Sequence, residues 1–153
     1  MTEVRPAEPG DLKELAALLD ELDRFYGASD IEPVEARLRQ IDEALFSDPP
    51  SAHALLAWQG ADLVGMATYS FLWPAAGVSR SLFLKELYVA TAHRRGGVGG
   101  LLVRSLFEIA AERRCTRVEW ATDDFNAEAQ RFYEALGHQP NPSKMLYRAE
   151  VGP

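Results

Sequence analysis

The segment 81–90 constrains the fold most strongly, because its side chains are apolar at both sets of alternating positions. In a regular strand the two faces would carry Leu82, Leu84 and Tyr88 on one side and Phe83, Leu87 and Val89 on the other. A strand that is apolar on both faces belongs in the interior of a covered sheet. We therefore expect 81–90 to be a long central strand.

The elements around this strand change from an antiparallel pattern to alternating strands and helices. Before it, we expect a strand at 2–5, helices beginning near Asp11 and Pro33, and a hairpin of strands 53–58 and 63–71. Glu14 is expected to form a capping-box pair with Asp11. After it, we expect a helix at 98–113, a strand at 116–121, a helix at 126–136 closed by Gly137, and a last strand at 144–148. This order predicts an α+β (mixed α/β) sheet.

Composition excludes several classes of protein. At 153 residues the chain is expected to form a single domain, 1–153. The 23 acidic against 16 basic side chains, a net charge of −7, disfavour a nucleic-acid-binding protein. One cysteine and the scattered histidines, His53, His93 and His138, predict no metal site. The absence of a long apolar run and of a signal-peptide core predicts a cytoplasmic protein that does not bind membranes.

A glycine-rich segment, Arg94-Arg95-Gly96-Gly97-Val98-Gly99-Gly100, directly follows the central strand and opens a helix. Backbone N–H groups at a helix N-terminus form an anion site, and phosphate is its common occupant. The segment lacks the Gly-Lys-Ser/Thr of a P-loop and the third glycine of a dinucleotide fingerprint. It fits Arg/Gln-x-x-Gly-x-Gly/Ala; the structural alternative is a glycine turn that only launches the helix.

A second informative segment, Asn126 to Gly137, forms a predicted helix one strand later. Taken singly, its residues have ordinary explanations. Asn126 is a favoured N-cap, Phe132 fits the core, and Tyr133 can pack in the core if its hydroxyl finds a partner.

The two segments together resemble the GNAT superfamily of acyl-CoA-dependent N-acyltransferases. The resemblance runs from Val4–Leu12 to the tyrosine helix, and its most specific part is Leu87-Tyr88-Val89, then 94–100, then the Asn126…Tyr133…Gly137 block. It implies a central, mostly antiparallel, twisted sheet of six to seven strands flanked by about four helices. It also implies acetyl-CoA as cosubstrate, no metal, and a homodimer as a state open to the chain.

The resemblance also implies roles for individual residues. The backbone of the central strand would bond the pantetheine arm, the glycine-rich segment would hold the pyrophosphate, and Asn126 and Phe132 would lie along the cofactor. Tyr133 would protonate the departing sulfur as general acid. The cofactor-binding residues implied in this way are Leu87, Tyr88, Val89, Arg94, Arg95, Gly96, Gly97, Val98, Gly99, Gly100, Asn126 and Phe132.

Glu86 is the one acidic residue in the central strand. A carboxylate in an apolar interior strand is unexpected unless it is paired. An alkylamine with a pKa near 10.4 costs about 3.4 pKa units, or roughly 4.6 kcal/mol, to present neutral at pH 7, so a base would help. We hypothesise that Glu86 is the catalytic base or binds the amine. The alternative is a structural pair, or a place near the solvated end of the strand.

The acceptor is predicted less sharply. The runs 64–73 and 82–89 resemble the diamine and polyamine acetyltransferase branch of the family, which implies a small-molecule amine. Tyr26, Tyr69 and Trp73 could line an aromatic cleft for an amine, or could be ordinary packing residues. Two other functions stay open: acetylation of proteins or peptides, and acyl-CoA binding without catalysis.

Overall fold

The structure is a computed structural model that describes residues 1–152. The chain separates into two compact units, residues 1–121 and the residues from 122 onward, and each is described by itself.

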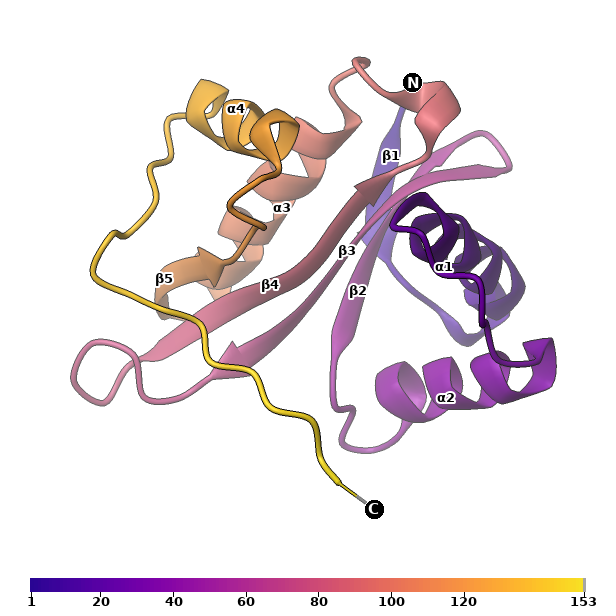
Figure 1. Ribbon diagram of the computed structural model, residues 1–153, viewed down its shortest axis with the longest axis horizontal. Helices are drawn as coiled ribbons and strands as arrows, with labels where there is room; N and C mark the ends of the chain where they lie inside the picture. The colour runs from indigo at the N-terminus through magenta and orange to yellow at the C-terminus, as the bar shows by residue number, and fades with distance from the viewer. Residues whose placement is uncertain (153) are drawn as a thin grey trace. The chain divides into compact units, whose positions relative to one another are not determined.

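The first unit contains one five-stranded sheet with the strands in chain order (Figure 1). Its strands are β1 (Glu3–Pro6), β2 (His53–Gln59), β3 (Asp62–Leu72), β4 (Arg80–Val89) and β5 (Cys115–Trp120). Neighbouring strands run antiparallel except β4 and β5, which are parallel. The parallel pair requires a crossover, and the helix between β4 and β5 supplies it.

Helices cover both faces of this sheet, as the doubly apolar central strand predicts. Helices α1 (Leu12–Phe25) and α2 (Val34–Phe46) pack against one face, and α3 (Val98–Glu112) packs against the other. Leu82 and Leu84 are buried on the α3 face, and Tyr88 is buried on the α1 face. The mixed α+β class with a mostly antiparallel sheet is therefore confirmed.

A β-bulge in β4 changes which side chains share a face. Thr68 of β3 pairs with Glu86 and Tyr69 pairs with Leu84, so Lys85 is an extra residue in β4. Because side chains alternate along a strand, the extra residue inverts the pattern beyond it. Leu87 and Val89 consequently pack against the α3 cluster beside Leu82 and Leu84, and the regular alternation predicted for 81–90 is wrong after Lys85.

Two further expectations are corrected. The sheet has five strands rather than six to seven, because the predicted strand 144–148 has no strand partner among the described residues and forms no strand. The Asp11–Glu14 capping box is absent as well. Asp11 instead accepts the Glu8 N–H (2.8 Å) and pairs with the Arg5 guanidinium (2.7 Å), which lowers the pKa of the Asp11 carboxyl.

The second unit is built around α4 (Ala127–Ala135). The Asn126 side chain accepts a hydrogen bond from the Ala129 N–H (3.1 Å), so it is the N-cap. Gly137 has φ of +92° just after the helix, as expected for a residue at the C′ position. The described residues beyond it form neither helix nor strand.

No helix within residues 1–152 has the length and apolar character required to cross a membrane.

Candidate active site

The first feature of the site is an edge of β4 that β5 does not cover. The parallel ladder between β4 and β5 begins at Arg80 and ends where Leu84 meets Trp120. Beyond that point the described residues give β4 no partner on its β5 side, although β3 continues to pair with it as far as Val89. The main-chain groups of 85–89 on this edge can therefore bond an extended ligand, as an added strand would.

The second feature is the N-terminus of α3, which begins only a few residues after β4 ends. The connecting segment contains a 3₁₀ turn (Thr91–His93) and two residues with positive φ, Arg95 (+67°) and Gly97 (+82°). Gly97 is the N-cap, and its carbonyl accepts the Leu101 N–H (3.1 Å). The first N–H groups of a helix have no partner within the helix, so those of Val98, Gly99 and Gly100 are suited to an anion.

The position of α3 depends on a close approach at Gly65 in β3. A Cβ at Gly65 would lie 3.0 Å from Cγ1 of Val98 and 3.3 Å from Cδ1 of Leu102. Any larger residue at this position would require the Val98 and Leu102 side chains to shift by a few tenths of an ångström. Gly65 therefore fixes how near the helix N-terminus lies to the end of β4.

The Arg94 side chain packs onto α1 and β4. Its Nε donates to the Val89 carbonyl (3.0 Å), and its Cζ lies 4.4 Å from the ring centroid of Phe25 and 5.2 Å from that of Tyr88. Cation–π contacts of this kind stabilise by about 0.5–2 kcal/mol. The side chain of the motif arginine thus ties the loop to the end of β4 and to α1.

Glu21 of α1 completes this connection. One carboxylate oxygen, Oε2, accepts both the Tyr88 hydroxyl (2.6 Å) and the Thr91 N–H (3.2 Å). Burial and then the hydrogen bond to Glu21 raise the pKa of Tyr88, so the hydroxyl stays protonated and remains a donor. Glu21 and Phe25 were not predicted from the sequence. Their spacing of four residues places them on one face of a helix, but it does not indicate that they contact Tyr88 and Arg94.

If the loop holds CoA, as the family resemblance implies, replacing Arg94 by Met should raise the Kd for CoA about tenfold, because the loop loses its hydrogen bond to Val89 and its cation–π contacts. Titration calorimetry measures this. The matched control is Arg104→Met, which removes the same charge from an exposed position on α3.

A double-mutant cycle separates positioning from direct charge. If Arg94 acts through the aromatic rings, Arg94→Met and Phe25→Leu should have strongly non-additive effects on CoA affinity. Additive effects would contradict the positioning role.

Glu86 lies on the face of the sheet that carries α1. It pairs with Thr68, two residues before the buried Tyr88, which packs in the α1 cluster. The Glu86 side chain is half-buried, whereas Lys85 in the bulge is exposed. The bulge therefore puts the strand's one carboxylate on the α1 face, at the point where the β4–β5 ladder has just ended.

The three aromatic residues considered for an acceptor cleft are not brought together. Tyr69 packs in the core cluster under α3, on the opposite face from α1. Tyr26 is exposed just after α1, beside Phe25. Trp73 is exposed in the β3–β4 turn, where its Nε1 donates to the Val78 carbonyl (2.8 Å). Tyr69 is thus separated from the α1 side of the sheet.

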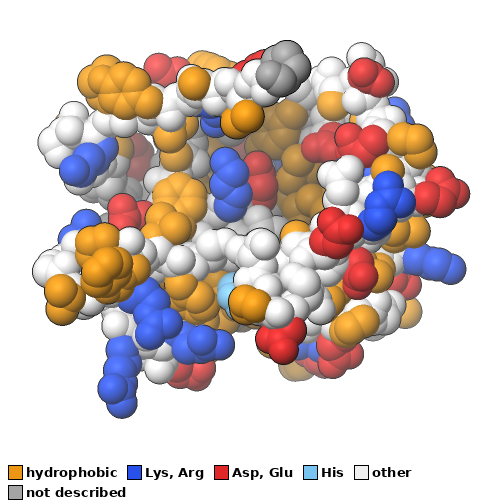
Figure 2. Space-filling model, turned by 90° about the horizontal axis from the view of Figure 1, so that it is seen from below, with side chains coloured by type: hydrophobic (Ala, Val, Ile, Leu, Met, Phe, Trp, Pro, Cys, Tyr) orange, Lys and Arg blue, Asp and Glu red, His pale blue; other side chains and the backbone are white. Residues whose placement is uncertain are grey.

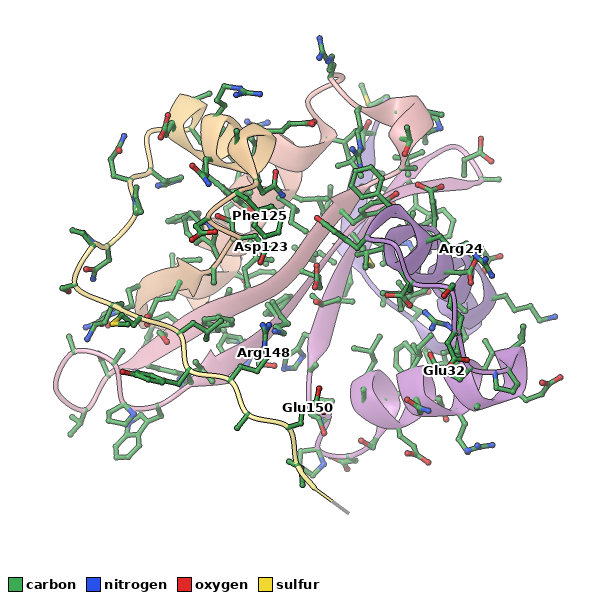
Figure 3. All side chains as sticks on the ribbon, in the orientation of Figure 1. Arg24, Glu32, Asp123, Phe125, Arg148 and Glu150 are labelled. Atoms are coloured by element: carbon green, nitrogen blue, oxygen red, sulfur yellow. The ribbon has the colours of Figure 1, made fainter. Side chains whose placement is uncertain are left out.

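The second unit carries the other predicted site residues on or next to α4. Asn126 caps the helix, and the rings of Phe132 and Tyr133 meet edge to face with centroids 5.0 Å apart. Figure 3 labels Asp123 and Phe125 in the segment before the helix. The Asp123 carbonyl accepts the Gln130 side-chain amide (3.2 Å), which helps to hold this segment against the first turns of α4.

Residues 8–48, which comprise α1, α2 and the turns next to them and are called the acidic helical layer below, hold the excess of negative charge. Residues 8–48 contain 12 Asp and Glu against 4 Lys and Arg, whereas the rest of the chain contains 11 against 12. Acidic side chains are prominent on the α1 and α2 side in Figure 2. Arg37, which is largely buried, is neutralised by Asp23 (2.8 Å) and by Glu32, labelled in Figure 3. These ion pairs connect α1, α2 and the loop between them. Asp23, Glu32 and Arg37 also line a cavity of about 210 Å³.

Among residues 1–152, no group of three or more His, Cys, Asp or Glu side chains is placed to hold a metal ion.

Comparison with known proteins relates this geometry to a family. The model described as the acetyltransferase (GNAT) family matches residues 15–138. A thialysine N-ε-acetyltransferase of Bos taurus is 28% identical over 144 residues, which cover 89% of this chain and 83% of that protein.

Solved structures share the fold. An integron cassette protein from the mobile metagenome of V. cholerae superposes with a TM-score of 0.89 at 25% identity, over 98% of this chain and 93% of that one. An aminoglycoside N-acetyltransferase in complex with CoA has a TM-score of 0.80 at 21% identity, over 99% and 96%. Since the family match covers most of the chain, from α1 to the end of α4, this protein is a member of the GNAT acetyltransferase family.

Proposed function

We propose that the protein transfers an acetyl group from acetyl-CoA to a primary amine of a small, positively charged molecule, by direct attack in a ternary complex. The observation that carries the proposal is the juxtaposition in the first unit of an open β4 edge, the N-terminus of α3 and an acidic helical layer. We further propose that both units act as one cytoplasmic acetyltransferase domain.

The cosubstrate fits the first two features. The pyrophosphate would accept hydrogen bonds from the N–H groups of Val98 to Gly100, favoured by the helix dipole. The pantetheine arm would bond the open edge of β4 at 87–89. When bound, acetyl-CoA supplies an acetyl thioester that an amine can attack.

The acidic layer supports a cationic acceptor. Its excess of negative charge lies on the same side of the sheet as Glu86, and a field of one sign raises the rate of encounter with oppositely charged ligands. The relative with 28% identity is named for acetylating thialysine, an amine of this kind.

Glu86 and Tyr133 would carry out the proton transfers of the reaction. Glu86, directly or through water, would take a proton from the ammonium group, which leaves the nitrogen lone pair free to bond the acetyl carbon. As the carbon–sulfur bond breaks, the Tyr133 hydroxyl would give its proton to the sulfur, and the resulting phenolate would be reprotonated by the second proton that the nitrogen loses, directly or through water, as it becomes an amide. A phenol with a pKa near 10 protonates a thiolate of pKa about 8.5 efficiently only when held in contact, so position matters most.

The direct test is release of free CoA thiol at saturating acetyl-CoA across a panel of acceptors. The panel contains thialysine, ornithine, a linear polyamine, a neutral-tailed monoamine, an aminoglycoside and N-terminal and lysine peptides. We expect the highest kcat/KM for a small amine with a second positive charge, and a fall in that value as ionic strength rises.

Other results would contradict the proposal. Turnover confined to peptides would indicate a protein acetyltransferase. CoA binding without thiol release for any acceptor would indicate a non-catalytic acyl-CoA-binding module.

A further inference from the structure

A second group of polar side chains lies at the other end of the sheet, around the ring of Phe71. Phe71 is near the end of β3, and the chain reaches this region again where β4 begins and where α3 ends. In Figure 1 this end of β4 lies opposite the loop that leads into α3. The group is therefore separate from the proposed CoA site.

Two arginines share the Phe71 ring. The Cζ of Arg113, the residue that follows α3, lies 5.2 Å from the ring centroid, and the Cζ of Arg80, the first residue of β4, lies 5.7 Å from it. Both side chains are exposed, and within residues 1–152 neither has a carboxylate within 4.0 Å. Two like charges are thus held beside one ring, and within residues 1–152 neither forms an ion pair.

The helix dipole explains the position of only one of the two arginines. A cation at the C-terminus of α3 is favourable, which explains Arg113. It does not explain Arg80, which belongs to β4 and approaches the same ring. A ligand that both guanidinium groups contact would explain the pair.

Two more hydrogen-bonding side chains adjoin the arginines. The imidazole of His53 stacks on the Tyr69 ring with centroids 5.3 Å apart and meets the edge of Phe71 at 5.4 Å. Tyr69 is only 7% exposed as a residue, but within residues 1–152 its hydroxyl is not among the fully buried polar atoms that lack a partner. The phenol is a hydrogen-bond donor, so it could bond an acceptor oxygen of a ligand held beside the arginines.

Arg113 is electrostatically close to both groups. Burial lowers the pKa of His53, and the charge of Arg113 lowers it further. Burial raises the pKa of Tyr69, and Arg113 opposes that rise. The hydroxyl and the imidazole therefore both lie within the field of this guanidinium, and an anion there would be stabilised by all of them.

We propose that His53, Tyr69, Arg80 and Arg113 form a binding site for a small oxyanion of the phosphate type. Two guanidinium groups match a dianion in charge, and a tetrahedral oxyanion has enough acceptor oxygens for the guanidinium, phenol and imidazole donors. A carboxylate offers only two oxygens and one charge. Phe71 serves as the platform that both guanidinium groups cover.

The test uses inorganic phosphate as the probe and the imidazole of His53 as the reporter. The His53 resonances are followed by NMR through a pH titration in phosphate, in acetate and in chloride at equal ionic strength, and are assigned with His53→Gln. We expect saturable phosphate binding with a Kd of about 1 mM. Because an anion favours the imidazolium, phosphate should raise the pKa of His53, and acetate should raise it less.

Matched variants tie the effect to these side chains. Arg113→Gln and Arg80→Gln should each weaken phosphate binding about tenfold, and Tyr69→Phe, which keeps the ring packing, should weaken it severalfold. Arg104→Gln removes the same charge from an exposed position on α3 and should leave the Kd within twofold.

Two results would overturn the proposal. The first is a His53 titration that is identical in phosphate and chloride. The second is an equal loss of binding in Arg104→Gln and Arg113→Gln, which would show a general charge effect.

Discussion

Tyr133→Phe should lower kcat at least about 100-fold while the Kd for CoA stays unchanged. Loss of a positioned general acid typically costs 10²–10⁴-fold in rate. The substitution keeps the aromatic ring, and with it the edge-to-face contact with Phe132. The Asn126 cap of α4 does not involve the phenol, so the helix should persist. Steady-state kinetics with saturating acetyl-CoA, together with calorimetric CoA titration, measure both quantities.

One control variant and one rejection criterion complete this test. Phe132→Leu removes the ring that the Tyr133 ring contacts but keeps the Tyr133 hydroxyl, so it should affect affinity more than turnover. The role of Tyr133 as acid is rejected if its Phe variant retains activity within about twofold of the parent.

Glu86→Gln should lower the rate at neutral pH about 100-fold and change the shape of the pH profile. With the carboxylate present, the acid limb of kcat/KM reports ionisation of the base. Without it, the rate should climb steadily toward the pKa of the amine near 10.4, because only the neutral amine then reacts. The profile should be recorded from pH 6 to about pH 10.

Lys85→Gln is the neighbouring control. Lys85 is the exposed residue of the bulge, and its replacement should leave the acid limb of the profile where it is. An unchanged profile in Glu86→Gln would exclude Glu86 as the base and leave it a structural group.

Much of the fold could be predicted because the relevant signals are local. The doubly apolar run at β4, the leucine spacing of α1 and the glycine after α4 each determine their own element, and each agrees with the structure. The segment 144–148 is apolar at 145–147, but a strand also needs a neighbouring strand to bond, and the sequence of the segment alone does not show whether one is present.

The details of the site were less predictable because they depend on register. The extra residue at Lys85 is visible only when β3 and β4 are aligned, and it decides that Glu86 lies on the α1 face. Likewise, the glycines of 96–100 indicate an anion site from local chemistry, but the contacts of Arg94 with Phe25 join residues nearly seventy positions apart. Tyr69, grouped with Tyr26 from its residue type, lies on the other face of the sheet.

Because the β4–β5 ladder ends at Leu84, the segment 85–89 presents both a free main-chain edge and its side-chain faces. Its edge offers amide and carbonyl groups, which every non-proline residue possesses, whereas its faces offer whichever side chains the gene encodes. Under the proposed function, substitutions between 85 and 89 would change the choice of acceptor and leave recognition of the thioester arm intact. The proposed site would thus allow acceptor preference to change during evolution while the acetyl donor stays the same.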